Sequence, residues 1–278
     1  MRAELQGDSK YRRKRKEMIK RVIDDVKRFY KYAEYSAKAE LKSEIANSHL
    51  SWLWWILDPM LFMLVYAFVS SIVFKATEKY FLAFVFVGVT CWDFFNKTVK
   101  QSVKLVTSNS AIVSKVYIPK YILIFVKMGN NAFKMAISFV LVFGMMILYR
   151  VPLSWNVLYM IPILVVLFVL TFGIGTILMH FGVYIEDLAN VVNVLLRLVF
   201  YISGVFYSIM TRVNEPYQSI LLKLNPIALI MQDMRLCLLY GQTPHRKLLL
   251  VWGLIGVILS VVGIRTVYKY ENSYVKVI

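Results

Sequence analysis

The sequence predicts an all-α integral membrane protein with six transmembrane helices, and three observations support this prediction. Hydrophobic residues make up 59% of the 278 residues and charged residues only 18%, with a mean hydropathy of +0.61, whereas soluble domains average roughly 45–50% apolar residues. Six stretches are apolar for long enough to cross a bilayer. Polar residues inside some of these stretches recur every three or four positions, which places them on one face of a helix.

Each helical crossing needs about 20 apolar residues, and six segments reach or approach this length. We expect the spans near residues 56–74, 81–95, 121–149, 157–179, 188–210 and 248–268. The second is short and the third is long, so the third is expected to begin in the membrane interface. An even number of spans puts both termini on one side. Lys and Arg are concentrated in the N-terminal segment and in the loop between the second and third spans, which predicts that this side is the cytoplasm.

The N-terminal segment is first basic and then amphipathic. Residues 1–16 contain the run KYRRKRK, and we expect an unstructured cytoplasmic tail. Although the formal net charge is +17, contact with anionic lipid is favoured over nucleic acid. Residues 17–50 place apolar side chains at intervals of three or four from Ile19 to Leu41, which is typical of an amphipathic helix lying in the interface. Residues 51–278 then form the six-span transmembrane domain.

The segment 211–247 is too long for a passive connection. Its two apolar pieces are separated by Asn225-Pro226 and contain embedded polar residues, including Arg235, so it cannot be a seventh crossing. Because Pro226 interrupts a helix, we expect a pair of short helices that form a re-entrant hairpin at the outer face.

Three of the expected spans have a polar or aromatic edge. In the fifth span, one helical face carries Asn190, Asn193, Arg197, Tyr201, Gly204 and Ser208. The first and third spans have similar edges. Polar groups are costly in hydrocarbon and face a bundle interior or a water-filled path, so we expect these edges to line a conduit. The expected lining consists of Asp58, Phe62, Tyr66, Asn131, Lys134, Asn193, Arg197 and Tyr201.

This lining suits a sugar polymer, because pyranose rings stack on aromatic side chains while their hydroxyls exchange hydrogen bonds with amides and hydroxyls. Lys134 and Arg197 would attract a phosphate or a diphosphate. The alternatives are that these residues hold the helices together, or that Lys134 extends to the cytoplasmic interface.

The sequence contains no motif for an energy source or a catalytic centre. It has no Gly-Lys pair and therefore no phosphate-binding loop of the Walker type. The three histidines are scattered, and Cys91 and Cys237 imply neither a metal site nor a disulfide framework. We therefore expect no catalytic residue, metal or cofactor in this chain. ATP-driven transport would need another subunit to bind ATP and Mg²⁺.

Five short motifs occur in order along the chain. The segment HLSWLWWILDPMLFMLVYAFVSSIV at 49–73 resembles the first-span signature of the permeases of polysaccharide-exporting ABC transporters. Further similarities to that family are VSKVYIPKYI at 113–122, YIEDL at 184–188, YISGVFY at 201–207, and Asn225-Pro226 followed by Arg235 and Gly241. The chain departs from the family pattern twice, with Glu186 in place of a usual arginine and Gly204 in place of a usual proline.

The resemblance implies a half-transporter in the bacterial inner membrane that pairs with a second copy of itself and with two ATP-binding cassette subunits. Its substrate would be a lipid-diphosphate-linked glycan or teichoic acid, such as an O-antigen or a capsular polysaccharide. An exporter of small drugs or lipids with the same architecture is an alternative. Another is a membrane enzyme that modifies lipid-linked sugars, for which Glu186-Asp187 is the only adjacent acidic pair within the matching motifs.

The resemblance also assigns roles to individual segments. The N-terminal amphipathic helix would be a gate. The loop at about 97–120 would couple to the ATP-binding subunit through Lys104, Asn109, Lys115, Tyr117 and Pro119. The cytoplasmic entrance would use His49, Trp52, Trp54 and Trp55, although tryptophans at that depth are also plain membrane anchors. The outer gate would contain Asn225, Pro226 and Arg235.

Overall fold

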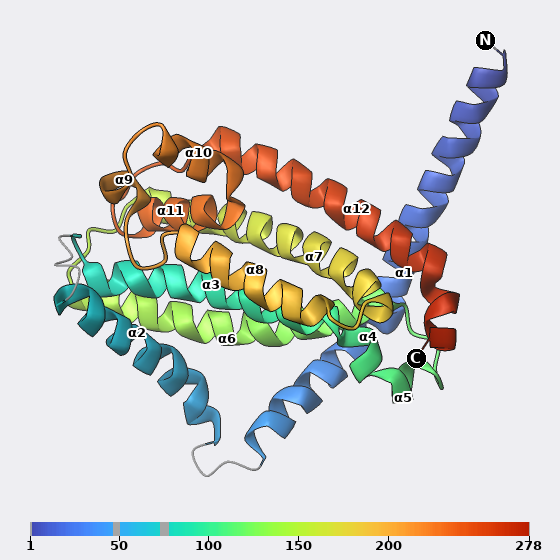
Figure 1. Ribbon diagram of the computed structural model, residues 1–278, viewed down its shortest axis with the longest axis horizontal. Coiled ribbons are helices and arrows are strands. Elements are labelled where there is room, and N and C mark those ends of the chain that lie inside the picture. The colour runs from blue at the N-terminus through green and yellow to red at the C-terminus, as the bar shows by residue number, and fades with distance from the viewer. Residues whose placement is uncertain (1, 47–50, 73–77, 278) are drawn as a thin grey trace.

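The computed structural model describes residues 2–46, 51–72 and 78–277, and the regular elements in these ranges are all helical (Figure 1). In chain order they are α1 (Arg2–Ile45), η1 (Ser51–Leu53), α2 (Trp54–Ile72), α3 (Phe81–Val103), α4 (Leu105–Ser108), α5 (Ser110–Val113), α6 (Lys120–Leu148), η2 (Trp155–Tyr159), α7 (Met160–Tyr184), α8 (Leu188–Ile202), α9 (Ile209–Arg212), α10 (Tyr217–Leu224), α11 (Pro226–Leu238) and α12 (Arg246–Val277).

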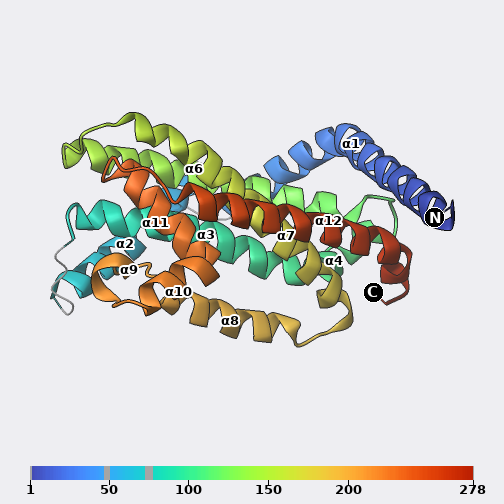
Figure 2. The ribbon, with the colours of Figure 1, turned by 90° about the horizontal axis from the view of Figure 1, so that it is seen from above.

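Helix α3 is the centre of the bundle. It contacts α2, α6, α7, α8 and α11, and Figure 2 shows α6 and α8 on opposite sides of it. Every side chain from Ala83 to Cys91 is buried, as expected for a helix that is apolar around its whole circumference. This core fixes the position of the polar residues in the second half of α3.

Four helical segments are long and apolar enough to cross a membrane: Phe81–Val103, Lys120–Leu148, Trp155–Tyr184 and Arg246–Tyr274. Two shorter apolar segments, Trp54–Val65 and Leu188–Ile202, belong to α2 and α8. By length and composition, the described residues therefore support four of the six predicted spans.

The predicted fifth span, 188–210, is wrong as a continuous helix. α8 ends at Ile202, and Gly204 has a φ of +67°. This left-handed conformation favours glycine and commonly ends helices. Gly204 and Ser208 therefore lie beyond the helix and do not continue the face that carries Arg197.

Helices α1 and α3 extend further than predicted. α1 begins at Arg2 and continues to Ile45, so the prediction of an unstructured tail at 1–16 is wrong for the described residues. This segment contains four Arg and three Lys, which are good helix formers. α3 continues to Val103, beyond the span predicted at 81–95. Hydropathy indicates where a helix leaves the hydrocarbon, and that point need not be where the helix ends.

Helices α7 and α12 pack with their backbones close together. A Cβ atom on Gly173 would lie 2.8 Å from Ser260 N, and one on Gly263 would lie 2.8 Å from Thr176 Cβ. Small residues allow such close approach between helices in membranes. The two helices run side by side from the end of the bundle that contains α10 and α11 towards α4 and α5 at the other end (Figure 1).

The segment after α8 divides into two main helices at the predicted position. α10 ends at Leu224 and α11 begins at Pro226, with Asn225 between them. Asn225 Oδ1 accepts hydrogen bonds from the backbone N–H groups of Ile227 and Ala228. Asn225 is therefore the N-cap of α11, and Pro226 occupies the first helical position, where its missing N–H costs nothing.

Candidate functional site

A polar cavity of about 300 Å³ lies where α1, α2, α3 and α6 meet. It is lined by Glu44, Trp54, Trp55, Asp58, Pro59, Thr90, Asp93, Phe94, Lys97, Asn131, Lys134, Met135 and Ser138. The lining includes five residues that the sequence predicted for the conduit or the entrance: Trp54, Trp55, Asp58, Asn131 and Lys134. The fold therefore brings residues from two predicted sites into one place.

Two lysines in the cavity are held by carboxylates. Lys97 Nζ lies 2.9 Å from Asp93 Oδ2 and 3.7 Å from Asp58 Oδ2. Lys134 Nζ lies 2.6 Å from Glu44 Oε2. Asp93 is one turn before Lys97 on α3, whereas Asp58 and Glu44 come from α2 and α1. The lining thus contains three carboxylates and two ammonium groups.

The last turns of α1 lie against α6 through further polar contacts. Glu40 Oε2 accepts hydrogen bonds from Lys127 Nζ at 2.9 Å and from Asn130 Nδ2 at 2.7 Å. The Glu40–Lys127 and Glu44–Lys134 pairs are partly exposed to solvent, and exposed ion pairs contribute only about 0–1 kcal/mol each. Glu44, near the end of α1, is the residue through which this helix reaches the cavity.

Thr90 brings an unused hydrogen-bonding group to the wall of the cavity. Its side chain is 3% exposed, and its Oγ1 has no hydrogen-bond partner among the residues that the structure describes. Asn131, by contrast, is fixed by α3, because its Nδ2 donates to Thr98 Oγ1 and Gln101 Oε1. A buried hydroxyl without a partner is costly, so a polar ligand that reached Thr90 would be favoured.

The residues predicted for the entrance do not all reach the cavity. Trp54 and Trp55 line it, and the ring of Trp55 meets that of Phe133 edge-on, with centroids 5.4 Å apart. Trp52 is exposed and is outside the lining. His49 lies outside the described residues.

The predicted conduit residues of α8 do not join this cavity. Arg197 is exposed, Tyr201 is 70% exposed and Asn193 is partly buried. Phe62 on α2 is also at the surface, and the side chain of Tyr66 lies outside the described residues. Because α8 and α6 lie on opposite sides of α3 (Figure 2), one chain does not enclose all three polar edges in a single passage.

The predicted coupling loop contains two short helices, α4 and α5, which meet at Asn109. Asn109 Nδ2 donates to Leu105 O at 2.8 Å and stabilises this turn. Lys104 and Lys115 are exposed, whereas Pro119 is buried at the start of α6. The two lysines are therefore open to a partner, while Asn109 and Pro119 have structural roles in this chain.

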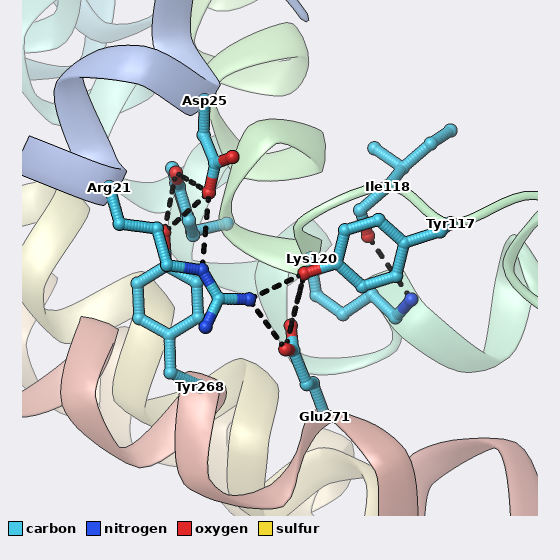
Figure 3. Close-up of polar contacts among 8 residues, drawn as sticks. Arg21, Asp25, Tyr117, Ile118, Lys120, Tyr268 and Glu271 are labelled. Carbon is cyan, nitrogen blue, oxygen red and sulfur yellow. Dashed lines mark hydrogen bonds and ion pairs between the residues drawn. The ribbon is translucent and has the colours of Figure 1, made fainter. Parts of the chain in front are cut away.

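Tyr117 belongs to a polar cluster that connects α1, the segment before α6, and α12 (Figure 3). Arg21 Nη2 donates to Tyr117 Oη at 2.7 Å and to Glu271 Oε1 at 3.1 Å. Tyr117 Oη also donates to Glu271 Oε1 at 3.2 Å. Burial and the neighbouring Glu271 raise the pKa of Tyr117, so the phenol remains a donor near neutral pH.

The other half of this cluster is centred on Asp25. Its Oδ2 accepts hydrogen bonds from Tyr268 Oη at 2.6 Å and from Tyr121 Oη at 3.2 Å. The two phenol oxygens lie 3.0 Å apart, and the guanidinium of Arg21 lies over the Tyr268 ring, 4.3 Å from its centroid. We call this cluster the α1 junction; it consists of Arg21, Asp25, Tyr117, Tyr121, Tyr268 and Glu271.

At the opposite end of the bundle, Arg235 is buried, with 1% of its surface exposed. Its Nε donates to Phe84 O at 3.0 Å, its Nη1 to Gly204 O at 2.9 Å and its Nη2 to Val205 O at 2.7 Å. The guanidinium also lies 3.6 Å from the centroid of the Phe84 ring. Arg235 therefore joins α11 to the turn after α8 and to the start of α3.

His245 gives this end of the bundle a pH-dependent contact. Its Nδ1 lies 2.6 Å from Oδ1 of Asp233, which is fully buried, and this hydrogen bond raises the pKa of His245 above its ordinary value of 6.5. The pKa of His245 is therefore higher in the folded protein than in the unfolded chain. The contact with Asp233 stabilises the fold fully below the unfolded-state pKa, and this stabilisation is lost as the pH rises through the folded-state pKa.

We expect the wild-type protein to unfold in detergent at a lower temperature at about pH 8.5 than at about pH 5.5, with part of this difference due to His245. His245→Gln keeps a hydrogen-bonding side chain but cannot gain a proton, so the difference should shrink. Thermal unfolding of both proteins across this range measures the effect. An unchanged pH dependence in the variant would contradict the role of His245.

Sequence reasoning missed Thr90, Asp93 and Lys97 in the cavity. Asp93 and Lys97 are four residues apart, which is the spacing of an ion pair on one helical turn, and this signal was present in the sequence. Glu44 gave no such signal, because its partner Lys134 is on another helix and the contact depends on how α1 packs.

Residues 34–239 match the family of ABC-2 type transporters. The O-antigen export system permease protein RfbA of Myxococcus xanthus is 28% identical over 222 residues, which cover 79% of this chain and 85% of that protein. Two proteins of the same name from Klebsiella pneumoniae are 25% and 24% identical, each over 86% of this chain and 92% of the relative. The family match includes the whole polar cavity, α4, α5 and Arg235. The chain belongs to the family of ABC-2 type transporters.

Proposed function

We propose that this chain is the membrane-spanning subunit of an ATP-driven exporter that moves a lipid-linked polysaccharide from the cytoplasm across the bacterial inner membrane. Membership of the transporter family supports the transport role, and the names of the relatives favour an O-antigen as the class of cargo. The main observation behind the proposal is the polar cavity, where two tryptophans, two lysines and a buried threonine hydroxyl meet beside α1.

In this proposal the cavity receives the phosphate-bearing head of the lipid carrier. Phosphate oxygens replace Glu44 on Lys134 and Asp58 on Lys97, so that one charged partner is exchanged for another, while Asp93 stays on Lys97. The side chains of Glu44 and Asp58 are 44% and 69% exposed, so they return to water at small cost. α1 thus acts as a gate whose own carboxylate occupies the site until the carrier arrives.

Trp54 and Trp55 are placed to receive the first sugar of the cargo. The apolar C–H faces of a pyranose ring stack on indole rings, while the phosphate bound at the lysines fixes the end of the glycan. Thr90 Oγ1 can then donate to or accept from a ligand oxygen, which satisfies a group that is otherwise buried without a partner among the described residues.

The working exporter contains two copies of this chain and two ATP-binding subunits, which hold the ATP and Mg²⁺. The outward edge of α8, with Asn193, Arg197 and Tyr201, faces the second copy across the conduit. α2 and α8 complete six crossings with both termini in the cytoplasm, and α9–α11 form a re-entrant outer gate. Lys104 and Lys115, exposed beside α4 and α5, contact acidic grooves of the ATP-binding subunits.

The head-group site is tested by replacing both lysines with neutral side chains, Lys97→Gln together with Lys134→Gln. The concentration of lipid-linked glycan that gives half-maximal stimulation of ATPase activity should rise at least about tenfold, because each hydrogen bond to a charged group contributes about 1.5–3 kcal/mol and about 1.4 kcal/mol is a factor of ten. The measurement uses the complex with its ATP-binding subunits in lipid nanodiscs.

Lys100→Gln is the matched control, because Lys100 is exposed on the same helix as Lys97 and is outside the cavity lining. It should respond to lipid-linked glycan as the wild type does. An unchanged response in the double variant would contradict the head-group role of the cavity. Stimulation by hydrophobic amines, with none by lipid-linked glycan, would assign the chain to a drug exporter.

A further inference from the structure

An apolar groove of about 540 Å³ lies beside the polar cavity. It is lined by Met60, Met63, Phe86, Val140, Leu141, Gly144, Met145, Ile147 and Leu148. Met63 and Phe86 are buried and form its floor, whereas Val140, Ile147 and Leu148 are exposed along its rim. The lining side chains are hydrocarbons or thioethers, and Gly144 has no side chain.

The groove continues the polar cavity along the same three helices. On α2, Pro59 lines the polar cavity and the next residue, Met60, lines the apolar groove. On α3, Thr90 lines the cavity and Phe86, about one helical turn away, lines the groove. On α6 the cavity includes Lys134 and the groove extends to Leu148, a distance of about 21 Å along the helix at ~1.5 Å per residue. The two compartments therefore follow one another along the same three helices, the first charged and the second apolar.

We propose that this groove binds the hydrocarbon tail of a polyprenyl diphosphate whose head group occupies the polar cavity. The inference rests on the proposed function and extends it, because it locates the tail of the carrier between α2 and α6. Once Glu44 and Asp58 have moved away, Lys97 and Lys134 can each bind one phosphate of a diphosphate head. Most bilayer phospholipids offer a single phosphate and two tails, which match this arrangement less well.

The residue composition of the groove wall also favours an isoprenoid chain. Met60, Met63 and Met145 contribute flexible, polarisable side chains that adapt to irregular surfaces, and a methyl-branched chain has such a surface. Because lipid tails are as apolar as the groove, the hydrophobic effect gives little net gain, and close packing must supply the selectivity. Filling the groove should therefore weaken binding of long chains specifically.

Gly144 offers a direct way to fill the groove. A Cβ atom on Gly144 meets nothing within 4 Å, and Gly144 lines the groove, so a large side chain there starts without a backbone clash and takes up groove volume. Gly129 is the matched control: it is also on α6, its Cβ also meets nothing within 4 Å, and it lines neither compartment. Gly144→Phe and Gly129→Phe thus differ in position but not in the change made to the helix.

The test measures equilibrium binding of two probes to the full complex in nanodiscs. One probe is a long-chain polyprenyl diphosphate. The other is geranyl diphosphate, whose tail is shorter than the ten residues from Lys134 to Gly144, about 15 Å along the helix. Gly144→Phe should weaken binding of the long chain about tenfold and leave geranyl diphosphate unchanged. Gly129→Phe should bind both probes as the wild type does, and thermal unfolding of both variants shows that they fold.

Equal affinity of the wild type and Gly144→Phe for the long chain would overturn the tail site. So would a bilayer phospholipid that stays bound in native mass spectrometry and that the long chain does not displace. The proposed function fails separately, because Lys134→Gln should weaken binding of both probes. If Lys134→Gln binds geranyl diphosphate as tightly as the wild type, the head-group site itself is wrong.

Discussion

Replacing Arg235 with leucine should lower the free energy of unfolding by roughly 2–6 kcal/mol, because two buried carbonyls lose their donors at about 1–3 kcal/mol each. These carbonyls belong to Gly204 and Val205, both buried in the turn after α8, where the helical hydrogen-bond ladder has ended. The midpoint of thermal unfolding in detergent should fall by on the order of 10 °C. Arg235→Lys should lie between the wild type and Arg235→Leu, because one ammonium group cannot reproduce the guanidinium fork.

Gly88→Ala tests the same contact from the opposite side. A Cβ atom on Gly88 would overlap Nη2 of Arg235, so the added methyl group displaces the guanidinium without removing its charge. Both changes break the same hydrogen bonds. The double variant, Arg235→Leu with Gly88→Ala, should therefore lose much less free energy of unfolding than the sum of the losses in the two single variants. Additive losses, or an Arg235→Leu protein as stable as the wild type, would show that this guanidinium does not hold the turn.

The long apolar helices could be predicted from sequence because a membrane span needs a minimum length of apolar side chains. The segments predicted at 121–149 and 157–179 correspond closely to α6 and α7. The end of α8 could not be predicted in this way. Apolar residues continue through Val205 and Phe206, and hydropathy does not register the backbone turn at Gly204.

Residues of the candidate site could be predicted only where their side chains were unusual for the helix that carries them. Asp58 and Lys134 stood out because a charge is unusual inside an apolar span, and both line the polar cavity. Glu44 belongs to an amphipathic helix in which charges are ordinary, so its contact with Lys134 gave no local signal. Asp25 and Tyr268 are 243 positions apart in the chain, and only the packing of α1 against α12 brings them together.

Replacing Asp25 with alanine should detach the middle of α1 from the bundle. Two phenol hydrogen bonds to the carboxylate, from Tyr268 and Tyr121, contribute about 1.5–3 kcal/mol each. Their loss should shift the equilibrium between docked and undocked α1 by about a hundredfold or more, since about 1.4 kcal/mol is a factor of ten. Tyr121 is fully buried, and without Asp25 its hydroxyl keeps only its contact with the Tyr268 oxygen, 3.0 Å away.

Hydrogen exchange of the α1 backbone and spin-label distances between α1 and α12 measure this undocking. Asp24→Ala is the matched control, because Asp24 is the exposed neighbour of Asp25 and carries the same charge on the same helix. It should exchange and dock as the wild type does. Equal protection of α1 in Asp25→Ala and Asp24→Ala would show that apolar packing alone holds the helix.

Undocking should also reduce export for each ATP hydrolysed, by about tenfold if the α1 junction transmits the movement of the ATP-binding subunits. Arg21 joins α1 to Tyr117, which lies between α5 and α6, and both residues contact Glu271 on α12. This junction therefore gives a displacement of α4 and α5 a direct route to α1, in addition to the contacts that α1 makes with α6, and α1 in turn carries Glu44 at the polar cavity. If Asp25→Ala undocks α1 in hydrogen exchange yet exports at the wild-type ratio to ATP, the gate opens without the junction, and Glu44 responds to the arriving carrier alone.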